Sequence, residues 1–225
     1  MIKFYFNGSP NPTKIALALE EMGLAYEAIP VDPRRGEQFN PAYLAVNPNA
    51  KVPSIIDDGI TVFDSNAILL YLAEKTGKFL PQADAANRAE LLSWLMFVAT
   101  GVGPFCGQAV HFRHFAPEQV PYAQKRYQFE ANRHFKILDD RLAQHRYLVA
   151  DTYTIADMSF WSWSRMAPFI MGDDAWAKYP NVKRFHDDIA ARPAAQKAVT
   201  LKDRHPFKAE IDEETRRNMF RHLAS

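Results

Sequence analysis

The spacing of apolar residues changes period several times in the first third of the chain. Residues 2–6 alternate between apolar and more polar side chains, which is the period of a β-strand. Over residues 12–22 the apolar side chains instead recur at helical spacing, and Gly23 follows as a typical helix end. Residues 25–31 again have the character of a strand. This order predicts two parallel strands joined by a right-handed helical crossover.

A second group of elements completes this region before residue 80. Residues 53–63 predict two short strands joined at Asp58 and Gly59, a familiar hairpin signal. Residues 64–77 return to helical spacing. We therefore expect an α/β domain over residues 1–80, followed by a polar, proline-containing connector.

The rest of the chain lacks strand signals. Leu91, Leu95 and Val98 hold helical spacing, so residues 88–205 are expected to form an all-helical domain. Residues 206–225 are rich in charge and are expected to wrap the surface or fray. The predicted fold class is thus α/β plus all-α.

One local signal in the helical region concerns folding and not function. In the sequence YTIADM, Thr154 can cap a helix, and Asp157 stands three residues later. A carboxylate at that position can reach back to the backbone of the capping residue, which makes a capping box. We expect a helix to begin there.

Composition narrows the classes of function. The chain has 225 residues, and its 27 lysines and arginines balance 26 aspartates and glutamates without blocks of like charge, which argues against a nucleic-acid partner. Its single cysteine, Cys106, excludes an intramolecular disulfide and is typical of a reducing cytosol. It begins with a strand-like segment and shows no uninterrupted apolar run long enough to cross a bilayer. We expect a soluble cytoplasmic protein that contacts no membrane.

The first turn of the chain carries two prolines and two short polar side chains. Asn11 followed by Pro12 matches a helix N-cap followed by the residue favoured at the first helical position. This pattern is explained by a well-made helix start alone. A functional interpretation is compatible with it, because an Asn11 amide and a Ser9 hydroxyl near a helix N-terminus would favour a bound thiolate.

Two further positions combine backbone and side-chain chemistry. Pro53 directly precedes a predicted strand. Two interpretations are open: an ordinary proline at the entry to a strand, or a proline after a cis peptide bond. A cis bond would turn the backbone of Val52 outward to pair with an extended peptide ligand. Ser65 stands at a natural N-cap position after Asp64, so the helix start could hold a carboxylate and Asp64 an ammonium. Acidic and hydroxyl residues also open many helices without any ligand.

Together these residues resemble the cytosolic glutathione transferase family over about residues 1–205. In that family a thioredoxin-like domain precedes an all-helical one. A cis-proline precedes the third strand, matched here by Pro53 after Val52. An acid and a serine open the third helix and hold the γ-glutamyl end of glutathione, matched here by Asp64 and Ser65, with aspartate in place of the commoner glutamate.

The closer similarity is to the Nu-class branch of bacterial disulfide reductases. Its Thr-Pro-Asn turn appears here as Ser9, Pro10 and Asn11, with Pro12 in place of the usual glycine. The resemblance implies a glutathione-dependent enzyme in which Ser9 and Asn11 hold the glutathione thiolate. It also implies a homodimer with the site near the subunit interface, and room for two glutathiones or one glutathione disulfide. Glutathione would be a co-substrate, and no metal is expected.

The same resemblance assigns binding roles to three more residues. Gln38 and Lys51 match positions that contact the glycine end of glutathione, and Arg133 matches a basic residue associated with the site. Conjugation of glutathione to small electrophiles, or isomerisation, is the alternative activity, with Phe105, Phe112 and Trp163 as expected pocket lining. A non-catalytic glutathione-binding or regulatory module is a third possibility, because fold does not fix function. Cys106 is expected to be a buried hydrophobic residue and not a nucleophile.

Overall fold

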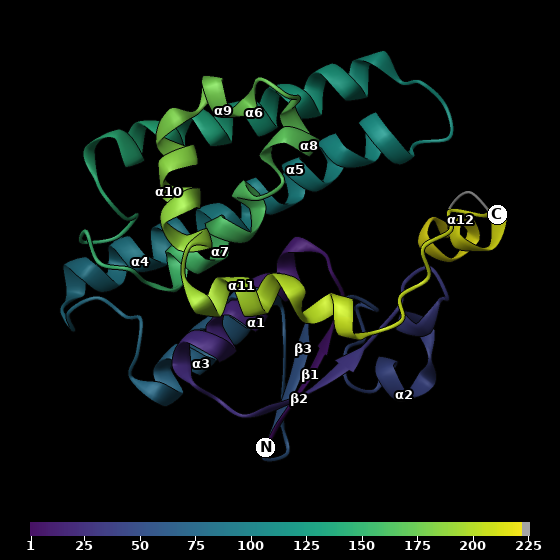
Figure 1. Ribbon diagram of the computed structural model, residues 1–225, viewed down its shortest axis with the longest axis horizontal. Coiled ribbons are helices and arrows are strands. Elements are labelled where there is room, and N and C mark those ends of the chain that lie inside the picture. The colour runs from purple at the N-terminus through teal and green to yellow at the C-terminus, as the bar shows by residue number, and fades with distance from the viewer. Residues whose placement is uncertain (222–225) are drawn as a thin grey trace. The chain divides into compact units, whose positions relative to one another are not determined.

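The computed structural model describes residues 1–221 of the chain (Figure 1). Two compact units are present: residues 1–72 together with the segment from residue 193 onward, and residues 73–192. This partition differs from the expected division into residues 1–80, 88–205 and 206–225. The cause is helix α11 (Pro193–Thr200), which packs on α1 (Pro10–Met22) and so lies with the sheet.

The first unit is built on a four-stranded sheet with the order β2-β1-β3-β4 (Figure 1). Strands β1 and β2 are parallel, whereas β3 is antiparallel to both β1 and β4. The strands are β1 (Ile2–Phe6), β2 (Tyr26–Pro30), β3 (Ser54–Asp57) and β4 (Ile60–Phe63). Parallel β1 and β2 joined through α1 are the arrangement that the apolar spacing predicts. The predicted hairpin joins β3 and β4 at Asp58 and Gly59, whose backbone is left-handed.

Helices and short helical turns complete the first unit. Alternate residues of β1 and one face of α1 form its core, in which Phe4, Leu17 and Ile55 are fully buried. The remaining elements are η1 (Glu37–Phe39), α2 (Pro41–Leu44), α3 (Ser65–Thr76), η4 (Leu201–Arg204) and α12 (Glu213–Met219). Helix α3 continues a few residues into the second unit.

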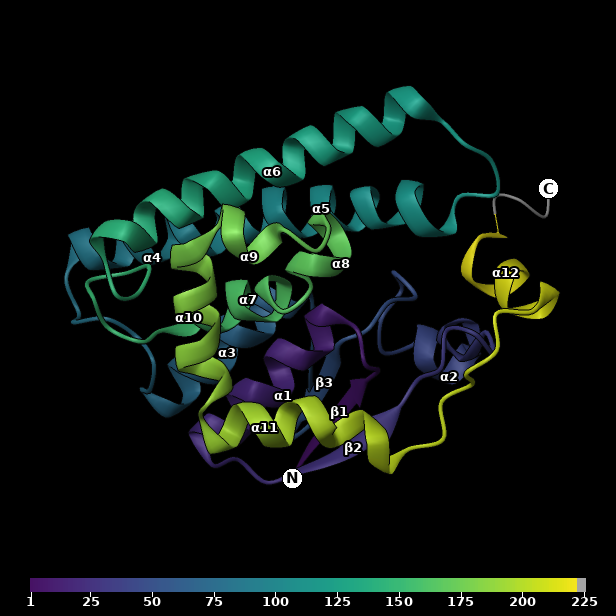
Figure 2. The same cartoon turned by 45° about the horizontal axis from the view of Figure 1, so that its top comes forward.

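The second unit is helical. In its described residues the only strand-like feature is a single bridge between Val149 and Thr152. Its long helix α6 packs against α5 and α10 (Figure 2). The elements are α4 (Ala85–Phe97), η2 (Val98–Val102), α5 (Gly103–Val110), η3 (His111–Phe115), α6 (Pro121–Gln144), α7 (Ile155–Ser164), α8 (Ala167–Met171), α9 (Ala175–Lys178) and α10 (Pro180–Ala190). The predicted fold class, α/β plus all-α, is confirmed.

The elements from α4 to η3 form one continuous helical run, Ala85–Phe115, of 31 residues. By length and composition alone this run passes the test for a membrane-spanning helix. Core helices of soluble bundles pass the same test. Leu95, Val98, Val102 and Cys106 on this run are fully buried within the protein, as in such a core helix.

The capping box at the start of α7 is present as predicted. Both oxygens of the buried Asp157 carboxylate are used: one accepts the N–H of Leu148, and the other accepts the N–H and the hydroxyl of Thr154. Burial raises the pKa of Asp157 to about 7, against the opposing effect of these hydrogen bonds. Asp157 thus ties the helix start to the segment before it.

Candidate functional site

The pairing of the strands brings four loops to one end of the sheet. Phe6, at the end of β1, lies beside Pro30 at the end of the parallel strand β2. Tyr5 is paired with Ser54 at the start of β3, and Ser54 is paired with Phe63 at the end of β4. The loops that follow β1, β2 and β4, and the loop that precedes β3, therefore meet at this end. Each of these loops holds residues that the sequence singled out.

A cavity of about 440 Å³ lies among three of these loops and the C-terminal segment of the first unit. Its lining consists of Asn7, Ser9, Asn11, Val31, Pro33, Gln38, Phe39, Asn49, Ala50, Lys51, Val52, Met219 and Phe220. Five residues singled out from the sequence are among them: Ser9, Asn11, Gln38, Lys51 and Val52. Pro53, Asp64 and Ser65 belong to the same end of the sheet but do not line the cavity.

Helix α1 begins two residues earlier than expected, at Pro10. Ser9 and not Asn11 is the N-cap of α1, with Pro10 at the first helical position. The expected cap at Asn11 was wrong because Pro10 fits the first turn equally well, and Pro12 lacks only an N–H that a helix start leaves unpaired in any case. Asn11 therefore lies inside the first turn, where its side chain is not needed as a cap.

The consequence of this geometry is a turn with few backbone donors and two free side-chain donors. Pro10 and Pro12 have no N–H, and the N–H of Ser9 is donated to the Asn7 amide oxygen at 2.9 Å. The Ser9 hydroxyl and the Asn11 carboxamide make no hydrogen bond to any of residues 1–221. Because Ser9 is exposed and Asn11 half-buried beside the cavity, both can donate to an anion there.

The loop before β3 supplies a cation to the same cavity. The carbonyl of Lys51 accepts hydrogen bonds from the Tyr43 hydroxyl and the Asn47 amide, both at 2.6 Å, so the backbone of the loop is held firmly. The Lys51 side chain is exposed and makes no ion pair within the described chain. Among the described lining residues it is the only charged side chain, which suits a ligand carboxylate. The bond between Val52 and Pro53 is cis, as the family resemblance implies.

Gln38 is buried, with 7% of its surface exposed. Its amide nitrogen donates to the carbonyl of Pro33 at 3.4 Å and to the carbonyl of Asn218 at 3.3 Å. Its amide oxygen is buried without a hydrogen-bond partner among the described residues. The side chain therefore lies in the cavity wall with both of its N–H donors already in use.

Asp64 takes the capping position that the sequence suggested for Ser65. Its backbone is left-handed, with φ 69°, and its Oδ1 accepts the N–H groups of Asn66 at 2.8 Å and Ala67 at 3.2 Å. The N-cap at Ser65 was thus wrong; helix α3 begins at Ser65, which is buried. The charge of Asp64 also acts on Lys14, whose burial lowers its pKa to about 7 while Asp64 opposes that shift.

Arg133 lies in the second unit, on α6. Its Nε donates to Glu130 at 2.9 Å, and Glu130 also accepts from Arg126 at 2.7 Å. These two arginines lower the pKa of Glu130. Arg133 is therefore already paired within its own helix, and its role in ligand binding stays a prediction.

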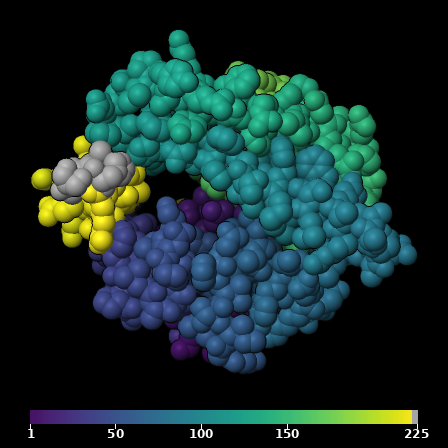
Figure 3. Space-filling model, turned by 180° about the vertical axis from the view of Figure 1, so that it is seen from behind, coloured from purple at the N-terminus to yellow at the C-terminus, as the bar shows by residue number. Residues whose placement is uncertain are grey.

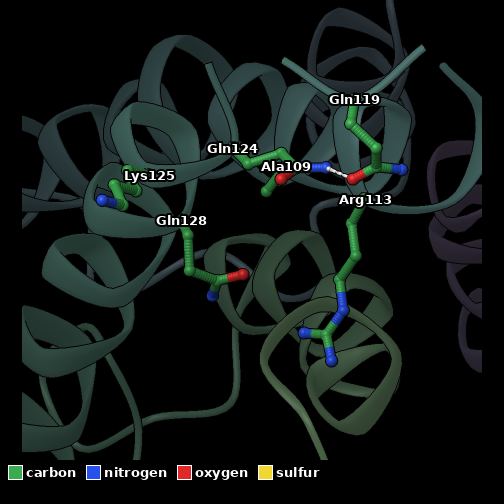
Figure 4. A pocket seen from close by; sticks show the side chains of 6 residues that line it. All are labelled: Ala109, Arg113, Gln119, Gln124, Lys125 and Gln128. Carbon is green, nitrogen blue, oxygen red and sulfur yellow. Dashed lines mark hydrogen bonds between the residues drawn. The ribbon is translucent and has the colours of Figure 1, made fainter. Parts of the chain in front are cut away.

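The second unit has a separate cavity of about 400 Å³. Gln124 on α6 donates to Gln119 at 2.8 Å (Figure 4). The guanidinium of Arg113 on η3 donates to the carbonyl of Ile170 at 3.2 Å. The lining residues are Ala109, Arg113, Gln119, Gln124, Lys125 and Gln128. Most of these lining residues are polar or charged, and none of them is one of the aromatic residues expected to line an electrophile pocket.

Those aromatic residues instead contact other rings of the unit or are buried in it. Phe112 stacks on Tyr127 at 5.3 Å between ring centroids, and Phe105 lies 5.2 Å from the ring of His134. Trp163 is buried. The structure gives Phe105, Phe112 and Trp163 packing contacts, and their role as electrophile lining stays a prediction.

Some cavity residues were missed from the sequence. Asn7 had a detectable signal, since an asparagine two residues before a helix cap commonly accepts a backbone N–H. Phe39 and Asn49 lie in the segment without periodicity, and Met219 and Phe220 lie in the C-terminal tail. No local pattern connects these four positions to the turn at Ser9.

A thioredoxin-like sheet with a cis-proline before β3, followed by a helical unit, defines the class of protein. Residues 1–74 match the glutathione S-transferase N-terminal domain, and residues 109–197 match a glutathione S-transferase C-terminal domain. The chain belongs to the glutathione S-transferase family, as the sequence resemblance indicated.

Within this family the chain is similar to individual proteins that are named as oxidoreductases or transferases. It is 43% identical over 213 residues to disulfide-bond oxidoreductase YfcG of Escherichia coli, a match that covers 88% of this chain and 94% of the relative. It is 39% identical over 215 residues to disulfide-bond oxidoreductase YghU of the same organism, covering 87% and 73%. A glutathione transferase from Pseudomonas putida, solved with one glutathione disulfide per subunit, is similar in structure with a TM-score of 0.83. That chain is 33% identical, with coverage of 89% and 91%.

Proposed function

We propose that this protein is a glutathione-dependent thiol-disulfide oxidoreductase in which Ser9 and Asn11 stabilise the glutathione thiolate. The observation that carries the proposal is the first turn, where two side-chain donors without a hydrogen bond to any of residues 1–221 line the cavity and the prolines leave few backbone donors. The oxidoreductase names of YfcG and YghU and the glutathione disulfide in the Pseudomonas putida structure support it.

In the proposed pose, glutathione lies along the cavity of the first unit. Its sulfur lies at Ser9 and Asn11, and its glycine carboxylate lies toward Lys51 and Gln38 on the opposite loops. The backbone of Val52 pairs with the cysteinyl residue. Asp64 and Ser65, at the neighbouring helix start, receive the γ-glutamyl group. Arg133 is proposed as a further basic residue of the site.

The chemistry needs no cysteine from the protein. A glutathione thiolate attacks one sulfur of a substrate disulfide, a new S–S bond forms, and the other substrate sulfur leaves as a thiolate that takes up a proton. A second glutathione thiolate then attacks the glutathione sulfur of the mixed disulfide and releases the second substrate thiol. Two glutathiones are oxidised to one glutathione disulfide, and the substrate is reduced to two thiols. Donors at Ser9 and Asn11 increase the thiolate fraction of the attacking glutathione.

Cys106 is not part of this mechanism. It is fully buried in the helical unit, and burial raises the pKa of its thiol well above the usual range.

We also propose that the protein is a cytoplasmic homodimer. Its molar mass in solution, measured by light scattering, tests the dimer.

The test of function compares two reactions on one preparation. We expect glutathione-dependent reduction of 2-hydroxyethyl disulfide to exceed the uncatalysed rate strongly, and conjugation to 1-chloro-2,4-dinitrobenzene to exceed it weakly. Dominant conjugation would favour the alternative transferase activity, which uses the same thiolate. Glutathione binding without acceleration of either reaction would favour a non-catalytic binding module.

A further inference from the structure

The C-terminal segment of the described chain lies across the loop that follows β2. We call residues 208–221 the C-terminal strap. The backbone N–H of Lys208 donates to Asp32 at 2.6 Å, and the Arg34 guanidinium donates to the carbonyls of Lys208 at 2.8 Å and Ala209 at 2.6 Å. Thr215 within the strap is fully buried. In the space-filling view the yellow atoms of the strap lie beside the dark blue and purple atoms of the N-terminal region (Figure 3).

The far end of the strap reaches the candidate glutathione cavity. The carbonyl of Asn218 accepts from the Gln38 amide at 3.3 Å, and the Asn218 side chain donates to the carbonyl of Arg34 at 3.0 Å. Met219 and Phe220 form part of the cavity wall. The guanidinium of Arg221 lies over the ring of Phe39, 3.2 Å from its centroid.

This contact uses a donor that the proposed glutathione pose requires. The Gln38 amide has two N–H groups, and they are donated to the carbonyls of Pro33 and Asn218. Its oxygen, which cannot bind a carboxylate, is buried without a partner among the described residues. A glycine carboxylate can bind Gln38 only if one of the two carbonyls is released. Pro33 belongs to the same short loop, whereas Asn218 is 180 residues away in the sequence.

We infer that the C-terminal strap is an autoinhibitory segment, in which the carbonyl of Asn218 competes with the glycine carboxylate of glutathione for the amide of Gln38. The inference rests on the proposed function. Binding of glutathione then displaces the end of the strap, and the strap lowers the apparent affinity of the site. The segment from Asn218 to Arg221 is the part that moves, because Lys208 and Ala209 are held separately by Asp32 and Arg34.

The test compares the full chain with a chain that ends at Glu210, which keeps the anchoring contacts of Lys208 and Ala209. Calorimetry gives the dissociation constants of glutathione and of γ-glutamylcysteine, which lacks the glycine. Truncation is expected to lower the constant for glutathione about five- to tenfold, the equivalent of one hydrogen bond between neutral groups. The constant for γ-glutamylcysteine should change by less than about twofold. Unchanged or weaker glutathione binding, or an equal gain for both ligands, would overturn the inference.

A second measurement uses the intact chain and does not depend on how the truncated chain folds. Hydrogen exchange of the amides of residues 213–221 is followed with and without saturating glutathione. Faster exchange with the ligand supports displacement of the strap, and unchanged or slower exchange contradicts it. If neither ligand binds either chain, the proposed glutathione site itself is wrong. Tight glutathione binding with a protected strap would instead keep the site and reject the strap inference.

Discussion

The amide oxygen of Asn7 accepts the backbone N–H of Ser9 at 2.9 Å. On the other side of the same residue, the carbonyl of Ser9 accepts both the N–H of Thr13 at 3.2 Å and its hydroxyl at 2.9 Å. These bonds hold the backbone of Ser9 on both sides, while its hydroxyl makes no hydrogen bond to the described residues. The turn holds two donors, from Ser9 and Asn11, in place before any ligand arrives, which is the requirement for electrostatic stabilisation of an anion.

Asn11 is expected to matter for turnover and Cys106 is not. Replacing Asn11 with alanine removes one donor to the thiolate and should lower kcat for disulfide reduction about 100-fold, by analogy with loss of one oxyanion donor. The nearly isosteric Asn11→Asp should be at least as harmful, because a carboxylate repels a thiolate. The control, Cys106→Ala, should retain kcat within about twofold. Equal losses for Asn11→Ala and Cys106→Ala would remove Asn11 from the mechanism.

Lys51 is expected to act in binding alone. Its ammonium makes no ion pair with residues 1–221 and is proposed to bind the glycine carboxylate in both the ground state and the transition state. Lys51→Gln should therefore raise KM for glutathione about tenfold with little change in kcat. Steady-state kinetics at varied glutathione concentration measure both values. With γ-glutamylcysteine as the thiol, the variant and the original should have similar KM. A fall in kcat at saturating glutathione would contradict a pure binding role.

The sequence predicted the architecture better than the positions of the caps. The change from alternating to helical spacing between residues 2 and 22 sufficed for β1 and α1, because burial of one face imposes the period. The cap of α1 was misplaced because Ser9 with Pro10 and Asn11 with Pro12 offer the same pair of signals, and only three-dimensional packing chooses between them.

The order of the elements predicts that candidate site residues lie close together only where they stand next to strand ends. Ser9, Asn11 and Val52 flank paired strands, so their proximity follows from the order of the elements. The contact of Gln38 with Asn218 has no such basis, because neither residue belongs to a periodic pattern and they are 180 residues apart. Interactions of this kind depend on tertiary packing and leave no local signal.

Asp157 is expected to be important for stability of the helical unit. Asp157→Ala would leave the N–H groups of Leu148 and Thr154 buried without acceptors, which should cost about 3 kcal/mol of the free energy of unfolding. Asp157→Asn keeps one acceptor oxygen and should cost less. Chemical denaturation followed by far-UV circular dichroism measures both. A loss below about 1 kcal/mol for the alanine variant would show that water satisfies these groups.

His186 is expected to make the helical unit sensitive to acid. Its ring stacks with those of Trp161 and Trp176, with centroids 6.4 Å and 5.2 Å away, and its Nδ1 is 3.4 Å from the Ser164 hydroxyl. Burial lowers the pKa of His186 to about 4 from its usual 6.5, and the charges of Arg165 and Lys183 act in the same direction against the opposing Asp187.

The sign of the effect follows from proton binding. Between pH 6.5 and about 4 the unfolded chain binds a proton at His186 that the folded chain does not. The free energy of unfolding should therefore be fully retained above pH 6.5 and fall, by up to about 2 kcal/mol from this residue, as the pH drops toward 4. His186→Phe keeps an aromatic ring without a titrating group. Denaturation at pH 7.5 and pH 5 should show a smaller acid loss in this variant, whereas the control His114→Gln, at an exposed histidine stacked on Phe169, should keep the original loss. An acid loss in His186→Phe equal to that of the original chain would assign the sensitivity to other groups.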